Sequence, residues 1–371
     1  MLILTLNVGS SSIKTGIYAC GDGMEMVPEP ALRESCQFDL SGGDGQEDVL
    51  TPLWKWVGDK AFDVVGHRVV HGGRKYSAAT RLTPRVVTDL QALVAVDPTH
   101  MPQALAVIQA AADRWPGTPQ VACFDTAFHR HMPRVAQMYP LPRDLESLGV
   151  VRYGFHGLSC EYIMHRLGEI DPVEAMGRIV IAHLGNGSSL TAVRGGRSID
   201  TTMGFSPTGG LMMGTRSGDL DPGVVLHLLE ADGAEAQIVG RLLNRQSGLL
   251  AVSEISADMR ELLEEEGKDY RAREAIALYC YQARKYLGAL VAVLGGLETL
   301  VFTGGIGEHA AEVRASICCD LDFLGIEIDE SANGVHREVI SVDDSRAKVR
   351  VLPTDEDSVI ARHAWTVVEG S

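Results

Sequence analysis

The chain has 371 residues, 45% of them hydrophobic, and a formal net charge of −16 at pH 7. This length predicts two or three domains with a large core. Nucleic acids and anionic membranes are bound through lysine and arginine, so a chain with a pI of about 5.2 is a poor candidate for binding either. Any phosphate must be held by local donors, a metal ion and a few placed cations.

Targeting signals and metal-binding cysteine motifs are not recognisable in the sequence. The N-terminus enters a predicted strand at Leu2, without the basic region, apolar core and cleavage site of a signal peptide. No run approaches the roughly 18 to 20 apolar residues that a membrane span needs. The seven cysteines are scattered, apart from Cys318 and Cys319, and none shows Cys-x-x-Cys spacing. We therefore expect a cytoplasmic protein with reduced cysteines.

The first stretch, residues 2–18, predicts a β-hairpin. Two apolar runs flank a polar turn at residues 7–12, which contains one glycine and three serines. Such a turn directs several N–H and O–H donors to one point, which suits phosphate oxygens. The Gly-x-x-x-x-Gly-Lys-Ser/Thr pattern of a P-loop is absent. The alternative is an ordinary hairpin with a serine-rich turn.

Two predicted strands of the N-terminal half carry charged residues. Residues 63–73 predict a strand that carries Arg68, and the segment before it, residues 20–60, is predicted to be peripheral. Burying an arginine is costly unless it meets an anion, so Arg68 belongs either to a structural salt bridge or to a ligand site. Asp125 ends the predicted strand 120–125, at the edge where ligands collect in open α/β sheets.

Two helices are predicted between these strands. Thr83 suits the N-cap and Pro84 the first position of a helix that runs to about residue 96. The second helix runs from Pro102 through Trp115. Beyond the strand at residues 120–125, a further helix is predicted at residues 159–167.

The opening pattern returns in the second half of the chain. Residues 178–193 again predict a strand, a Gly-Ser turn and a strand. After a shift of 177 positions (188 minus 11), Ser11-Ser12-Ile13 aligns with Ser188-Ser189-Leu190. Two such hairpins, each opening one half of the chain, predict a duplicated domain with two phosphate-binding turns facing one cleft.

A long loop is predicted at residues 200–222. It has too many glycines for a helix and too many breaks for a strand, and long loops of this kind are usually functional or disordered. Arg216 lies among small residues, so its guanidinium can reach a cleft. The alternative is a surface arginine paired with Asp219 or Asp221.

The C-terminal part predicts helices and two more strands. Residues 299–303 predict a strand, followed by a glycine-rich turn at residues 304–308 and a helix through Cys318. A strand is predicted at residues 349–352. The acidic residues at 355–357 follow it, and either the dipole of the next helix stabilises them at its N-terminus or they supply a carboxylate to Mg²⁺. Helices are predicted at residues 222–232, 256–266, 271–294 and, at the end of the chain, 358–371.

Seven segments, in order along nearly the whole chain, together resemble the acetate kinase family. They are LNVGSSSIK (6–14), GHRVVHGG (66–73), FDTAFH (124–129), RYGFHG (152–157), HLGNGSS (183–189), GGLMMGTRSGD (209–219) and FTGGIGE (302–308).

The resemblance implies an α/β fold of the actin-like ATPase (ribonuclease H-like) kind, with two duplicated domains around a nucleotide cleft. Their predicted limits are residues 1–148 and 149–357, with the helix at 358–371 packed back on the first domain. It also implies a homodimer that takes part in acetyl-CoA biosynthesis through ATP + acetate ⇌ ADP + acetyl phosphate. The implied metal is Mg²⁺, with Mn²⁺ as an alternative.

The resemblance also implies roles for individual residues. Arg68 and Arg216 clamp the carboxylate and the transferring phosphoryl group, His156 stabilises that group, and Asp125 helps to place metal and phosphates. Metal binding falls on Asn7 and Glu356, and the pocket for the substrate methyl group on Val70, Phe155 and Pro207. Nucleotide binding falls on Ser12, Lys14, His183, Gly185, Asn186, Gly187, Gly304, Gly305, Ile306, Gly307 and His309.

These roles suit the chemistry, because an ionised carboxylate needs no general base and transfer needs only positioning and charge stabilisation. The chain departs from the family where Thr99 replaces a common leucine and His309 a common asparagine, and in being somewhat shorter than many members. Thr99 leaves propionate kinase as an alternative. The same fold would also serve an actin-like ATPase that acts as a chaperone or scaffold, or a sugar-type kinase with Asp125 as base.

Overall fold

The computed structural model describes residues 1–9, 12–20, 29–39, 47–230, 233 and 235–369. The chain forms two compact units. The N-terminal unit comprises Met1–Arg130, Gly157–Tyr162 and Asp355–Ser371, and the C-terminal unit His131–His156 and Ile163–Thr354. The domain limits expected from the sequence, residues 1–148 and 149–357, stay a prediction.

The N-terminal unit is built on a six-stranded sheet of order β3-β2-β1-β4-β6-β5. The first three strands form an antiparallel meander, β4 and β6 continue the sheet parallel to β1, and β5 pairs antiparallel at the edge. The strands are β1 (Leu2–Val8), β2 (Ser12–Ala19), β3 (Ala31–Asp39), β4 (Val64–Val69), β5 (Thr80–Arg81) and β6 (Gln120–Phe124).

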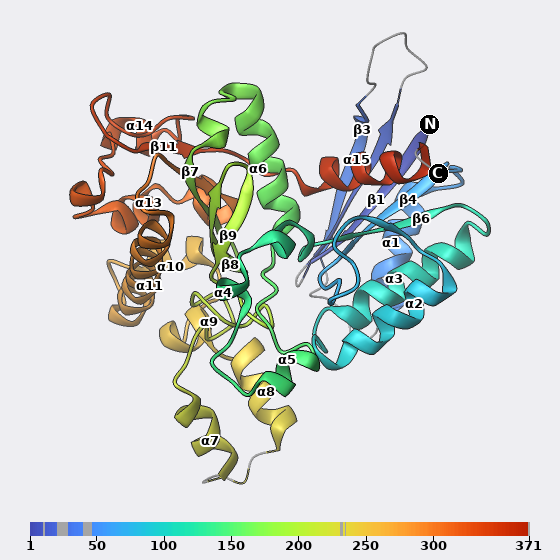
Figure 1. Cartoon of the computed structure of the whole chain (residues 1–371), viewed down its shortest axis with the longest axis horizontal. Helices are drawn as coiled ribbons and strands as arrows, with labels where there is room; N and C mark the ends of the chain where they lie inside the picture. The colour runs from blue at the N-terminus through green and yellow to red at the C-terminus, as the bar shows by residue number, and fades with distance from the viewer. Residues whose placement is uncertain (10–11, 21–28, 40–46, 231–232, 234, 370–371) are drawn as a thin grey trace. The chain divides into compact units, whose positions relative to one another are not determined.

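Alternating side chains bury both faces of this sheet, as the period of a strand requires. Leu4 and Leu6 pack with Leu53 of α1 (Glu47–Val57) and Val107 of α3 (Met101–Arg114). On the opposite face, Ile3 packs with Ile360 of the C-terminal helix α15 (Glu356–Glu369), drawn in red in Figure 1. Helix α2 (Pro84–Gln91) has Thr83 as its hydrogen-bonded N-cap, as predicted, and continues into the 3-10 helix η1 (Ala92–Ala95). A second 3-10 helix, η2 (Ala127–His131), follows β6.

The C-terminal unit repeats this topology. Its sheet has the order β11-β10-β7-β8-β9, again an antiparallel meander with two strands added parallel to the first. The predicted duplication is therefore confirmed at the level of strand order. The strands are β7 (Arg178–Leu184), β8 (Ser188–Arg194), β9 (Arg197–Thr201), β10 (Thr299–Thr303) and β11 (Lys348–Val351).

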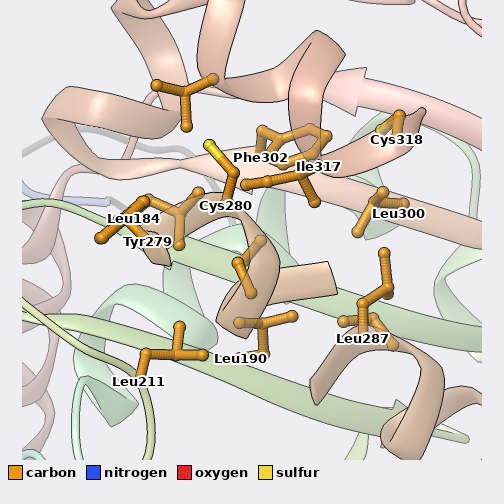
Figure 2. Close-up of a cluster of buried hydrophobic side chains, with 14 of the residues drawn as sticks. Leu184, Leu190, Leu211, Tyr279, Cys280, Leu287, Leu300, Phe302, Ile317 and Cys318 are labelled. Atoms are coloured by element: carbon orange, nitrogen blue, oxygen red, sulfur yellow. The ribbon is translucent and has the colours of Figure 1, made fainter. Parts of the chain in front are cut away.

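The long helix α11 (Tyr270–Leu294) supplies the centre of the second core. Figure 2 shows Tyr279 and Leu287 of α11 among Leu190 and Phe302 of the sheet. Residues 202–221 contain neither helix nor strand, as predicted for the long loop. The other helices are α4 (Arg134–Gln137), α5 (Arg143–Ser147), α6 (Gly157–Ile170), η3 (Glu174–Met176), α7 (Pro222–Glu230), α8 (Ala236–Arg245), α9 (Gly248–Ser253), α10 (Met259–Glu265), α12 (Gly304–His309), α13 (Ala311–Cys318), η4 (Asp322–Leu324) and α14 (Glu330–Gly334).

Two local predictions were wrong. Residues 20–60 are not merely peripheral, because they supply β3 and the helix α1, whose Leu53 and Val57 are fully buried. The glycine-rich segment after β10 is a helix, α12, rather than a turn, and the carboxylate of Glu308 accepts a hydrogen bond from its first N–H, at Gly304 (2.9 Å). In the described part of the chain, no helix is long and apolar enough to cross a membrane.

Candidate active site

In the N-terminal unit, Arg68 and Asp125 form a buried ion pair. Arg68 lies near the end of β4 and Asp125 follows the parallel neighbour β6, so both side chains reach the carboxyl edge of the sheet. Arg68 Nε lies 3.1 Å from both carboxylate oxygens, and Nη2 lies 2.7 Å from Oδ2. The side chains are 13% and 1% exposed. Arg68 therefore forms an ion pair in this structure, and its role at a ligand site stays a prediction.

Asn7 and Glu356 extend this pair into a network of four side chains. Asn7, on β1, accepts a hydrogen bond from Arg68 Nη1 (3.2 Å) and donates one to Glu356 Oε2 (3.0 Å). Glu356, in the first turn of α15, lies 3.9 Å from Arg68 Nη1. We call Asn7, Arg68, Asp125 and Glu356 the Arg68 network. It brings one predicted clamp residue together with both predicted metal ligands.

Burial and pairing oppose each other within the Arg68 network. Burial lowers the pKa of Arg68, but Asp125 and Glu356 outweigh it, so the pKa lies above its usual value. Burial raises the pKa of Asp125, against the attraction of Arg68. Next to the network, burial raises the pKa of Asp357 to about 6, although Thr5 donates a hydrogen bond to it. Asp355 accepts a hydrogen bond from Ser358 N–H, so it caps α15.

In the C-terminal unit, His156 is held in an unusual conformation. It precedes α6 with a φ of 57°, in the left-handed region that non-glycine residues rarely adopt. Its Nδ1 lies 2.9 Å from Oγ of Ser189, a fully buried residue of β8. Its ring stacks on that of His183, with centroids 4.3 Å apart. Strain of this kind persists where the surroundings fix the residue, often at a functional site.

His156 and Arg216 converge at Gly187. A Cβ placed on Gly187 would lie 3.1 Å from His156 Nε2 and 3.4 Å from Arg216 Nη1, so both nitrogens approach this turn. Arg216 is 8% exposed and donates to the carbonyl of Pro207 (3.1 Å). It is therefore a buried residue, and the alternative of a surface arginine is wrong.

Gly248 supports the backbone of Arg216. Its φ is +67°, and a Cβ there would lie 2.1 Å from the Met213 carbonyl and 2.8 Å from the Arg216 carbonyl. Met213 N–H in turn donates to the Arg216 carbonyl (3.1 Å). Only a residue without a side chain allows this approach.

The two predicted hairpins both form. Asn7 pairs with Lys14 in the first, where Lys14 is exposed and Ser12 half-buried; Ser10 and Ser11 lie outside the described residues. In the second, Gly185 N–H donates to the Gly187 carbonyl (3.1 Å), and the exposed Asn186 accepts from Gly214 N–H through its carbonyl (3.1 Å).

The glycine-rich segment 304–309 forms α12 directly after β10. Gly304 has a φ of +78° and packs on the Leu184 carbonyl, where a Cβ would lie at 2.7 Å. Gly305 is exposed with open space at its Cβ position, and His309 is exposed at the other end. The first N–H of α12, at Gly304, is engaged by the Glu308 carboxylate, whereas Gly305 in the same turn and His309 at the other end are exposed.

Sequence relatives place the chain in a known family. The sequence model described as the acetokinase family matches residues 55–362. The chain belongs to the acetokinase family. It is 45% identical to an acetate kinase of Rhodopseudomonas palustris over 397 aligned residues, covering 100% of this chain and 99% of that one. It is 40% identical to an acetate kinase of Micrococcus luteus, with full coverage of both.

Solved structures of the acetokinase family agree. The acetate kinase of Porphyromonas gingivalis superposes with a TM-score of 0.84 at 37% identity, covering 99% of each chain. A propionate kinase of Francisella tularensis superposes with a TM-score of 0.87 at 32% identity, again covering 99% of each. The predicted actin-like ATPase fold is thus confirmed, and the chain is a phosphotransferase of this family.

The donors of the Arg68 network fit Mg²⁺, which prefers a few carboxylate and amide oxygens and keeps several waters. Both oxygens of Asp125 are engaged by Arg68, so Glu356, at 12% exposure of its side chain, is the carboxylate best placed to contribute. Within the described ranges, no group of three His, Cys, Asp or Glu residues is arranged to hold a metal by itself. Such a site would therefore rely on water and substrate phosphates.

The residues predicted to bind the substrate methyl group are all buried. Phe155 is 1% exposed and Pro207 is buried, both in the C-terminal unit. Val70, which is 5% exposed, belongs to the N-terminal unit.

Three residues that the sequence did not single out contribute to these groups. Ser189 holds His156, Gly248 supports Arg216, and Arg314 holds α12. Ser189 was visible only as part of a repeated Gly-Ser turn. Gly248 and Arg314 carry no short-range signal, because their roles depend on contacts between segments that are distant in sequence.

Proposed function

We propose that this member of the acetokinase family transfers the γ-phosphoryl group of ATP directly to acetate, reversibly, giving acetyl phosphate and ADP. The observation that carries the proposal is the convergence of His156 Nε2 and Arg216 Nη1 on the Gly187 turn. A cation and an imidazole at one turn suit the charge that develops on a transferring phosphoryl group. Acetate is ionised at neutral pH, so no general base is needed.

Arg68 supplies the second cation of the proposed clamp. A planar guanidinium matches a carboxylate or phosphate in two-point fashion. Its two-point pairing with Asp125 fixes the plane of the guanidinium, and Nη1 points to Asn7 and Glu356. In this proposal Asp125 orients Arg68 and thereby positions the acetate oxygen that attacks phosphorus.

The remaining assignments complete the proposal. Glu356 and Asn7 hold Mg²⁺, or Mn²⁺ in its place, and the bound metal neutralises charge on the ATP phosphates. Val70, Phe155 and Pro207 are each assigned to binding of the methyl group. Phosphate oxygens are held by the turn at residues 185–187 with Ser12, Lys14 and His183, and adenosine by Gly304, Gly305, Ile306, Gly307 and His309.

We further propose a cytoplasmic homodimer that supplies acetyl-CoA biosynthesis. The apolar helix α7 supports the dimer, because Val224 and Leu226 are 45% and 55% exposed in the single chain and none of its residues is buried. An apolar helix without a buried residue suits burial against a second copy. Sedimentation velocity tests the proposed dimer. The wild type is expected to sediment as a dimer and Leu226→Glu as a monomer. A monomeric wild type contradicts the proposal.

A hydroxamate assay with ATP and Mg²⁺ tests the reaction. Acetate, propionate, butyrate and glycerol are compared, with ADP release measured in parallel. We expect acyl phosphate from acetate, with propionate as the closest competitor because Thr99 replaces a larger leucine. ATP hydrolysis without acyl phosphate from any carboxylate contradicts the proposal and favours an ATPase scaffold, and phosphorylation of glycerol favours a sugar-type kinase.

A further inference from the structure

Arg314, on α13, is a fully buried arginine without a carboxylate partner. Among the described residues it is one of the largest fully buried side chains, with 0% exposure, and none of the ion pairs found there involves it. Burying a charge is costly, and arginines are almost never fully buried unless they are paired. Its guanidinium must therefore be compensated in another way.

Neutral acceptors from two helices compensate the charge. Arg314 Nη1 donates to the carbonyls of Gly307 (2.9 Å) and Glu308 (3.0 Å), which belong to α12. Its Nε donates to Asn333 Oδ1 (2.8 Å), and Nη2 to the Asn333 carbonyl (2.8 Å) and to His336 Nδ1 (2.9 Å). Asn333 lies in α14 and His336 follows it. We call Arg314, Asn333 and His336 the Arg314 clamp.

The Arg314 clamp occupies the C-terminal end of α12, where helices leave carbonyls unpaired. A cation there is favoured by the helix dipole. At the other end, the Glu308 carboxylate accepts from the N–H groups of Gly304 (2.9 Å) and Thr354 (3.2 Å). Helix α12 spans only Gly304–His309, and so short a helix is not stable alone. Its position is thus set by side chains at both ends.

The Arg314 clamp also reaches the outward-facing residue of α12. The ring of His336 meets that of His309 edge-on, with centroids 6.4 Å apart. Asn333 Nδ2 donates to the Ala311 carbonyl (2.8 Å), which fixes the link between α12 and α13. One buried cation therefore joins α12, α13 and α14.

We propose that Arg314, acting through α12, is a positioning residue for the nucleotide. It fixes the exposed edge at Gly305 and the ring of His309, so that adenosine meets a preformed surface. This inference rests on the proposed binding of adenosine at residues 304–309. Arg314 touches no substrate itself, and the acyl site is not expected to depend on it.

The test compares Arg314→Lys with the wild type in steady-state kinetics. Lysine keeps the charge but loses the planar fork of five donors, so it cannot hold both α12 carbonyls and Asn333. We expect the KM for ATP to rise about tenfold or more, while the KM for acetate stays within about twofold. Titration of ADP into the protein, which needs no turnover, is expected to show the same loss of affinity.

Arg350→Met is the matched control. Arg350 is also a buried arginine of the C-terminal unit, but its partners are Glu174 and Glu338 and not α12. We expect this variant to lower the melting temperature without changing the KM for ATP. Equal shifts in the KM values for ATP and acetate in Arg314→Lys, or a nucleotide effect of equal size in Arg350→Met, would show a purely structural role and overturn the proposal.

A second variant covers the case that Arg314→Lys does not fold. Asn333→Ala removes the acceptor of Nε but leaves the guanidinium and both α12 carbonyls in place, so a smaller loss of ADP affinity is expected. Unchanged ADP affinity in this variant overturns the proposal. If the wild type forms no acyl phosphate, the proposed function fails, and the ADP titrations still decide the role of Arg314.

Discussion

Ser189 Oγ lies 2.9 Å from His156 Nδ1, so the hydroxyl of a buried strand residue fixes the ring of the histidine before α6. A hydroxyl can either donate to or accept from Nδ1. When Ser189 donates, the proton of a neutral His156 lies on Nε2, the nitrogen that approaches Gly187 and Arg216. Ser189 then keeps a donor directed at the proposed phosphoryl position.

We expect Ser189→Ala to lower kcat about tenfold with little change in the KM for acetate, since a lost hydrogen bond of about 1.4 kcal/mol gives that factor. Ser189→Thr, which retains a hydroxyl, is the rescue variant. Thr191→Val is the matched control, because Thr191 is buried on the same strand and its hydroxyl pairs with Thr201. A kcat in Ser189→Ala equal to that of Thr191→Val contradicts the orienting role.

A second prediction concerns the Arg68 network. Arg68→Ala leaves the buried Asp125 without its partner, and breaking a buried ion pair in this way costs about 3–5 kcal/mol of stability. We also expect kcat/KM to fall by at least about 100-fold, because the clamp loses a cation. Urea unfolding and the hydroxamate assay measure the two effects.

The double variant Arg68→Ala/Asp125→Asn separates the structural role from the catalytic one. Replacing the unpaired carboxylate with an amide removes the buried charge, so we expect part of the lost stability to return while activity stays low. Activity that recovers together with stability indicates that Arg68 serves only as a structural ion pair. A kcat/KM near that of the wild type in Arg68→Ala alone would also indicate that Arg68 has only a structural role.

Several helices and strands could be predicted because their signals are short-range, whereas the fold class followed from the family resemblance. The two hairpins, the Thr83-Pro84 helix start and the apolar strand before Asp125 each depend on neighbouring residues, and all of them formed. The strand β3 escaped because it lies at the sheet edge with mostly exposed residues, so it lacks an apolar alternation. The prediction for residues 304–308 was wrong because glycines favour a turn. The helix forms there because the Glu308 carboxylate accepts a hydrogen bond from its first N–H, at Gly304.

The candidate site was predictable only in part. Motifs identified Arg68, His156 and Arg216, whose catalytic roles stay predictions. The partners that fix them are distant in sequence: Ser189 is 33 residues from His156, and Asp125 is 57 residues from Arg68. Only the folded chain brings such pairs together, so their contacts had no signal in the sequence.

The third prediction concerns stability at low pH. In η3, Glu174 accepts hydrogen bonds from Arg350 Nε (2.7 Å) and Lys348 Nζ (2.8 Å). Burial raises the pKa of Glu174, but these partners outweigh it and lower the pKa from 4.5 to about 2. The stabilisation is therefore complete above the unfolded-state pKa of 4.5 and is lost as pH falls towards about 2.

Glu174→Gln checks this sign. We expect it to be less stable than the wild type at neutral pH, and the difference in unfolding free energy to shrink as the pH is lowered from about 6 to about 3. Glu265→Gln is a suitable comparison, because Glu265 pairs with Lys268 at the exposed surface, where an ion pair contributes little. A difference that is independent of pH contradicts the assignment of the acid-sensitive stability to Glu174.

The last prediction concerns Gly248, which supports the loop that carries Arg216. Alanine at a φ of +67° costs about 1–2 kcal/mol, and its Cβ would also contact the Met213 and Arg216 carbonyls. We expect Gly248→Ala to lower both stability and kcat, since the backbone of Arg216 must move. Gly240→Ala is the control: Gly240 lies within α8 with open space around its Cβ position, so alanine is expected to raise stability by about 0.5–1 kcal/mol. Thermal unfolding and the hydroxamate assay distinguish the two, and a Gly248→Ala enzyme with unchanged kcat shows that Arg216 is held independently of this contact.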